Sequence, residues 1–188
     1  MTQIRVFYES DINRPFSLCP EEVHLWLIRW HKIENWIVNH WSLLEKPDEI
    51  YVERFKVQED RFRSAAGKII TKLLASKYLH IPLNCISIRT GNYGKPEIVL
   101  GKSPHLAFSI SHSGDYVVLA FGLKRVIGVD VEQVKELPEY LELAQHFFTQ
   151  EESSEIKEIR HFYNYWTAKE AYVKALGVGL QKPLDSFY

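Results

Sequence analysis

The sequence predicts an α+β protein of two similar lobes related by pseudo-twofold symmetry, each an antiparallel-rich sheet packed with a long helix. Two observations support this fold class. Each half of the 188-residue chain contains several β-rich runs, and each half contains one long segment with helical periodicity. The predicted lobes are residues 1–103 and 104–188. Because no sequence identity between the halves is visible, the duplication is a hypothesis.

The first half begins with residues 1–20, expected to be an irregular arm because two prolines interrupt it. In residues 22–30 apolar and aromatic side chains alternate, which predicts a strand buried on both faces. The segment 31–44 is ambiguous between helix and loop. A long helix is predicted from 59 to 79, where apolar residues recur at helical spacing. The shorter elements expected in this half are a helix from Pro47 and strands at 85–89 and 97–100.

Three β-rich runs open the second half, and the short polar breaks between them predict an antiparallel meander. Two helices are expected after the meander, and the second is interrupted near His161. The strands are predicted at 106–110, 116–121 and 126–132, and the helices at 138–147 and 149–176.

Composition narrows the class of protein but not its chemistry. The formal net charge of −1 gives no support for a nucleic-acid or membrane partner. No apolar run reaches the roughly 20 residues that span a bilayer, and the N-terminus lacks the pattern of a signal peptide. The two cysteines, Cys19 and Cys85, are expected to be reduced thiols. We therefore expect a cytoplasmic, monomeric globular protein.

Two carboxylates occur in the run Gly128-Val129-Asp130-Val131-Glu132. On a strand, residues two apart point to the same face, so Asp130 and Glu132 are expected side by side. Such a pair is costly to bury without a cation, and Mg²⁺ commonly binds one or two carboxylates together with substrate phosphates. A pair of solvated charges at the end of a strand is the alternative, and it stays open.

A second group of candidates is expected on the last long helix. Trp166, Glu170 and Lys174 are spaced four residues apart, so on a helix they share one face. Trp166 would anchor this face in the core while the two charged side chains reach a pocket. An ordinary ion pair on a surface helix explains the same spacing.

Two turns carry further candidates. In Ser111-His112-Ser113-Gly114-Asp115, hydroxyls and His112 can donate to a phosphate, although a lone histidine in a turn is often incidental. A serine hydrolase is not supported, because adjacent Ser and His do not easily form a nucleophile–base bond. Gly94-Lys95-Pro96 places a cation in a tight turn without the spacing of a Walker A loop.

Taken in order, these elements resemble the 4'-phosphopantetheinyl transferase superfamily, specifically its larger two-lobed type that activates surfactin synthetase. The resemblance covers roughly residues 50–188, and the first 50 more loosely, and it implies the fold of that superfamily. The matching elements are Gly94-Lys95-Pro96, Ser109-Ile110-Ser111-His112-Ser113, Gly128-Val129-Asp130-Val131-Glu132, Phe147-Phe148-Thr149 with Glu151 or Glu152, and Trp166-Thr167-Ala168-Lys169-Glu170-Ala171-Tyr172-Val173-Lys174.

The resemblance implies roles for individual residues. Asp130, Glu132 and Glu170 would coordinate Mg²⁺ bound to the pyrophosphate of coenzyme A, and Lys174 would contact those phosphates. Glu170 also matches a position proposed as general base in relatives. The remaining implied contacts to coenzyme A are Arg63 and His112 at the 3'-phosphate, Gly94, Lys95 and Pro96 on the adenine side, and Ser111 on the phosphate side.

The implied reaction is Mg²⁺-dependent transfer of the 4'-phosphopantetheine arm of coenzyme A to a serine of an apo acyl or peptidyl carrier protein, with release of 3',5'-ADP. Two alternatives stay open. One is a metal-dependent phosphohydrolase. The other is a module that binds coenzyme A or a carrier protein without transfer. The second alternative arises because relatives usually continue with further strands, so we expect the second lobe of this chain to be truncated.

Overall fold

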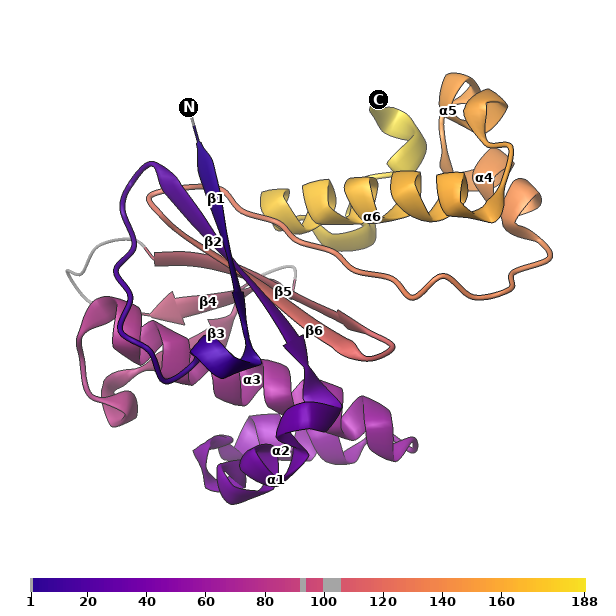
Figure 1. Cartoon of the computed structure of the whole chain (residues 1–188). Coiled ribbons are helices and arrows are strands. Elements are labelled where there is room, and N and C mark those ends of the chain that lie inside the picture. The colour runs from indigo at the N-terminus through magenta and orange to yellow at the C-terminus, as the bar shows by residue number, and fades with distance from the viewer. Residues whose placement is uncertain (1, 92–93, 100–105) are drawn as a thin grey trace.

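The computed structural model describes residues 2–91, 94–99 and 106–188. Their mixed α+β architecture is built on one four-stranded sheet with the strand order β1-β2-β6-β5 (Figure 1). A two-stranded hairpin of β3 and β4 lies apart from that sheet. The strands are β1 Gln3–Tyr8, β2 Glu22–Arg29, β3 Ser87–Thr90, β4 Pro96–Val99, β5 Leu106–Ser113 and β6 Tyr116–Leu123.

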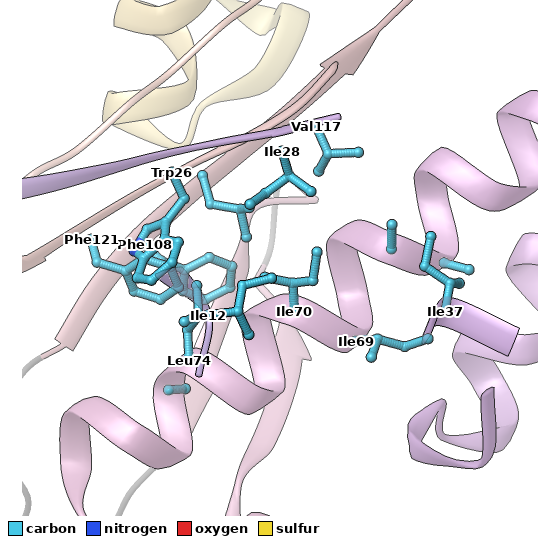
Figure 2. Close-up of a cluster of buried hydrophobic side chains, with 14 of the residues drawn as sticks. Ile12, Trp26, Ile28, Ile37, Ile69, Ile70, Leu74, Phe108, Val117 and Phe121 are labelled. Carbon is cyan, nitrogen blue, oxygen red and sulfur yellow. The ribbon is translucent and has the colours of Figure 1, made fainter. Parts of the chain in front are cut away.

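One face of the sheet is covered by the long helix α3, Gln58–Leu79. Because side chains alternate along a strand, β2 directs His24, Trp26 and Ile28 to this face, where all three are fully buried. Figure 2 shows Trp26 and the aromatic side chains of β5 and β6 gathered against Leu74 of α3. Two shorter helices, α1 Glu34–Asn39 and α2 Lys46–Glu53, pack against α3.

The contact between α3 and β5 is closest at Gly67 of the helix. A Cβ at Gly67 would lie 2.4 Å from Cδ1 of Ile110, well inside normal contact distance. Glycine ordinarily weakens a helix interior, so its presence here is explained by this close approach. The face that carries α3 therefore holds the main hydrophobic core.

The other face of the sheet is approached by the C-terminal helices (Figure 1). They surround a second, smaller apolar cluster that contains Phe148, Ile156 and Phe162. No helix among the described residues has the length and apolar character that crossing a membrane requires. The helices are α4 Tyr140–Phe147, α5 Gln150–Glu155 and α6 Ile159–Leu176.

Several sequence predictions are confirmed, namely the strand at 22–30 and the helices at 59–79 and 138–147. The helix predicted over 149–176 is interrupted as expected, but the break falls at residues 156–158, before His161. The prediction that β2 is buried on both faces is only half right. Val23, Leu25 and Leu27 are partly exposed on the face opposite α3.

Two predictions were wrong. Residues 1–20 are not wholly irregular, because β1 pairs in parallel with β2. Most of its apolar side chains are exposed, Ile4 by 63%, so the strand is maintained by its pairing with β2 and by Phe7, which stacks on Trp26 with the ring centroids 4.7 Å apart. The strand predicted at 126–132 is absent, since residues 125–137 have no regular secondary structure. The meander therefore consists of two antiparallel strands, β5 and β6.

The boundary predicted between residues 103 and 104 lies outside the described residues. Strands from both sides of it share one sheet, because β2 is hydrogen-bonded to β6 along seven residue pairs. The two-lobed symmetry is thus not confirmed, while the coarser α+β class is.

Candidate active site

Asp130 and Glu132 lie in the segment between β6 and α4, which runs beside the outer strand β5. β5 has a serine at every second position from 109 to 113, so three hydroxyls point to the face opposite α3. These hydroxyls contact both backbone amides and carboxylates of the segment. The bonds are Ser109 Oγ accepting from Val129 N at 3.1 Å, Ser111 Oγ donating to Asp130 Oδ1 at 2.7 Å, and Ser113 Oγ donating to Glu132 Oε2 at 2.7 Å.

Gly128 brings this segment against α6. A Cβ at this position would lie 1.8 Å from the carbonyl oxygen of Ala171 and 2.6 Å from the amide nitrogen of Ala175. No side chain fits at such distances from a helix backbone, so glycine is required by the close approach. The contact spans the helical turn between Glu170 and Lys174, which places Asp130 next to that turn.

Lys174 reaches across from α6 to the segment. Its Nζ donates to Asp130 Oδ1 at 2.5 Å and to Ser111 Oγ at 2.9 Å. The carboxylate of Asp130 is only 4% exposed. Its other oxygen, Oδ2, is buried and has no hydrogen-bond partner among the described residues. An unpaired buried carboxylate oxygen is costly, and a bound cation is one way to satisfy it.

Glu170 belongs to the same electrostatic group. Burial raises its pKa above the ordinary value of 4.5, and the charges of Asp130 and Glu132 raise it further, while the Lys174 ammonium lowers it. Mutual repulsion of carboxylates is what a divalent cation relieves, so the donor set suits Mg²⁺. Within the described residues, no three such side chains already converge at the spacing of metal ligands. Binding would therefore require side-chain movement at the site.

A cavity of about 300 Å³ opens beside Glu170 and Lys174. The β3–β4 hairpin forms its opposite wall with Gly94, Lys95 and Pro96. The structure thus brings together five of the residues that the sequence singled out. The cavity is completed by residues of β5 and by the C-terminal end of α6, which are Phe108, Ser109, Ile110, Val173, Gly177 and Gly179.

The ammonium group of Lys95 is bound to backbone carbonyls of the protein itself. Its Nζ donates to the carbonyl oxygens of Ile127 at 3.1 Å and Ala175 at 2.8 Å. Burial lowers the pKa of this lysine. Lys95 therefore connects the hairpin, the segment that carries the carboxylates, and the last turn of α6.

Arg63 and His112 lie near each other but do not line this cavity. Arg63 Nη1 donates to the carbonyl oxygen of Gly114 at 2.7 Å, and its side chain also pairs with Asp60. Burial lowers the pKa of His112, and the charges of Arg63 and Lys174 lower it further. On this side of β5, which faces α3, Arg63 carries the charge, and the lowered pKa favours the neutral form of His112.

Sequence reasoning left the choice between Glu151 and Glu152 open, and the structure resolves their positions. Glu151 is exposed, whereas Glu152 is 3% exposed and forms an ion pair with Lys169 at 2.8 Å. Glu152 also completes a capping box with Thr149 at the start of α5. The spacing Thr-x-x-Glu was a signal for this structural role. Sequence reasoning named the hydroxyls of this turn only as possible phosphate donors and did not anticipate the bonds of Ser109 and Ser113 to the carboxylate segment.

Comparison with known proteins gives a consistent result. A family model described as "4'-phosphopantetheinyl transferase, N-terminal" matches residues 28–123, and one described as "4'-phosphopantetheinyl transferase superfamily" matches residues 126–188. The chain is 36% identical over 140 residues to 4'-phosphopantetheinyl transferase Sfp of Bacillus subtilis, covering 71% of this chain and 60% of that protein. It is 30% identical over 175 residues to 4'-phosphopantetheinyl transferase HetI of a Nostoc species, covering 88% of this chain and 73% of that protein.

A third relative is 4'-phosphopantetheinyl transferase gsp of Aneurinibacillus migulanus, 30% identical over 141 residues, which is 72% of this chain and 56% of that protein. The chain thus spans less than two thirds of the length of several relatives that it matches.

Proposed function

Because the chain belongs to the 4'-phosphopantetheinyl transferase superfamily, we propose that it transfers the 4'-phosphopantetheine arm of coenzyme A to a serine of an apo acyl or peptidyl carrier protein. The observation that supports this proposal best is the cavity between α6 and the β3–β4 hairpin. It is bordered by Glu170 and Lys174, and Lys174 in turn contacts Asp130. Carboxylates and a cation beside one cavity suit a phosphorylated substrate.

In this reaction the serine hydroxyl of the carrier attacks the β-phosphorus of coenzyme A. The new bond joins the serine oxygen to phosphorus, the pyrophosphate bridge breaks, and 3',5'-ADP leaves. Lys174 binds and orients the phosphates, and Ser111 supports it with a hydroxyl. Glu170, next to the cavity, accepts the serine proton. Positioning and charge neutralisation supply most of the rate acceleration in such transfers.

Asp130, Glu132 and Glu170 would hold Mg²⁺, which when bound supplies neutralisation of phosphate charge. The buried, unpartnered Oδ2 of Asp130 and the raised pKa of Glu170 support this assignment within the described residues. Lys174 would give up its bond to Asp130 Oδ1 and turn to the phosphates. Arg63 would offer positive charge to the 3'-phosphate from the neighbouring region, and His112 would offer a ring N–H as a hydrogen-bond donor.

The test is a mass measurement. The protein is mixed with apo acyl or peptidyl carrier proteins, coenzyme A and Mg²⁺, and the carriers are weighed by mass spectrometry. A gain of one phosphopantetheine that disappears with EDTA and in Asp130→Ala supports the proposal. Unchanged masses across several carriers would refute it. In that case, release of 3',5'-ADP or inorganic phosphate from coenzyme A without a carrier indicates a phosphohydrolase, and binding of coenzyme A without products indicates a binding module.

A further inference from the structure

We propose that Ser113 is a positioning residue that acts through Glu132, and that the alternating serines of β5 set the orientation of the carboxylate segment. This inference rests on the proposed function, because it concerns the metal ligands of that site. Ser113 would touch neither coenzyme A nor the carrier. It would orient a side chain that holds the metal.

The first argument is the two-point contact that Ser113 makes. Its Oγ donates to Glu132 Oε2 at 2.7 Å and accepts from the backbone N of Gln133 at 3.1 Å. One hydroxyl therefore restrains both the carboxylate and the backbone that carries it.

A second contact restrains the same place. Gly114 follows Ser113 in the turn between β5 and β6 and has a positive φ of 53°. A Cβ on Gly114 would lie 2.8 Å from Cδ of Gln133, so the Gln133 side chain rests directly on this turn. The turn thus contacts the segment at two adjacent positions: the hydroxyl of Ser113 forms hydrogen bonds to it, and Gly114 leaves room for the side chain of Gln133.

The third argument is that neither secondary structure nor packing fixes the orientation of Glu132. Residues 125–137 have no strand or helix hydrogen-bond pattern. Glu132 itself is exposed, so packing does not restrict its rotamer. A hydrogen bond from a neighbouring hydroxyl is then the contact that selects its orientation. Groups that orient metal ligands in this way typically contribute roughly 10- to 100-fold to metal affinity or activity.

The experiment measures Mn²⁺ binding to the full chain with coenzyme A and without carrier, from the free Mn²⁺ signal in electron paramagnetic resonance. We expect Ser113→Ala to weaken Mn²⁺ binding about tenfold. Ser113→Thr keeps the hydroxyl and should restore binding to within about threefold of wild type. Ser154→Ala is the matched control, because Ser154 is exposed and its Oγ donates to the carbonyl of Glu151. This control should bind like wild type.

A double-mutant cycle separates positioning from general destabilisation. In a Glu132→Ala background, Ser113→Ala should have little further effect on Mn²⁺ binding, because the side chain that Ser113 orients is absent. An equal loss in both backgrounds, or wild-type binding by Ser113→Ala, would overturn the inference. If the wild type binds Mn²⁺ but modifies no carrier, the proposed function fails while the cycle still tests this inference.

Discussion

The two sides of the four-stranded sheet are joined to their helices by different chemistry. On the α3 side, apolar side chains such as Trp26, Ile70 and Leu74 are fully buried against one another. On the α6 side the connections are polar or involve the backbone. Lys174 bonds to a serine of β5, Lys95 bonds to the α6 backbone, and Gly128 of the 125–133 segment lies directly against that backbone. Apolar packing is non-directional, whereas hydrogen bonds define direction. The side with less hydrophobic stabilisation is therefore the one that orients the candidate carboxylates Asp130 and Glu132.

The largest effect is expected where a buried charge loses its partner. Lys169→Met leaves the carboxylate of Glu152 buried and unpaired, and it removes bonds to the carbonyls of Leu184 and Phe187. Breaking such a pair should lower the free energy of unfolding by about 3–5 kcal/mol, measured by urea titration. The control is Lys157→Met at an exposed lysine, which should change it by less than about 0.5 kcal/mol. Equal effects of the two changes would contradict this account of the α6 side.

Two glycine substitutions compare the sides directly. In Gly128→Ala the new Cβ meets the α6 backbone, so the helix must move by about an ångström, and such shifts cost about 100-fold in activity. In Gly67→Ala the clash is with the flexible tip of Ile110, so we expect about 1–2 kcal/mol of lost stability and little loss of transfer activity. Carrier mass spectrometry and thermal melting measure the two quantities. Similar activity losses in both variants would refute the contrast.

Lys95→Met sharpens the comparison by removing a polar connection while keeping the length of the side chain. Losing its bonds to Ile127 and Ala175 loosens the contact between the carboxylate segment and α6. We expect kcat to fall about tenfold with the KM for coenzyme A nearly unchanged. A tenfold loss is the size of effect expected when a charged hydrogen-bond donor is removed. A rise in KM alone would instead assign Lys95 to direct contact with coenzyme A.

The smallest effect concerns pH. Burial and the charges of Arg63 and Lys174 hold the pKa of His112 below 6.5, so the unfolded chain binds this proton more readily than the folded chain. Its contribution to stability is therefore complete above pH 6.5 and is lost as the pH falls through the lowered pKa. Urea titrations at pH 7.5 and 5.5 should show that His112→Gln loses less free energy of unfolding than wild type between the two pH values. An identical loss in both proteins would show that His112 does not contribute.

The sequence predicted the α3 side well because its signals are local. Helical periodicity over residues 59–79 and alternation over 22–30 both reflect burial against a single neighbour. β1 was missed because its exposed apolar side chains follow no core pattern and its stability depends on pairing with β2. The run at 126–132 has the composition of a strand, yet its partners are side-chain hydroxyls rather than a backbone ladder.

The sequence indicated which residues belong to the candidate site, but not how they are brought together in space. Strand and helix spacing indicated that Asp130 lies near Glu132 and that Glu170 lies near Lys174. The contacts that join the two pairs depend on backbone proximity between distant segments, such as Gly128 against Ala171. No local pattern encodes such a distance. The assignment of Asp130, Glu132 and Glu170 to Mg²⁺ stays a prediction, as does a cytoplasmic monomer.

The bond from Lys95 to Ala175 joins residues 80 positions apart in the chain. Closing so long a loop costs conformational entropy before any contact compensates for it, so contacts of this kind form late in folding. During synthesis from the ribosome, the sheet and α3 are complete in sequence by Leu123, about fifty residues before the end of α6 is made. Glu170 therefore comes near Asp130 and Glu132 only after α6 has been synthesised and has docked.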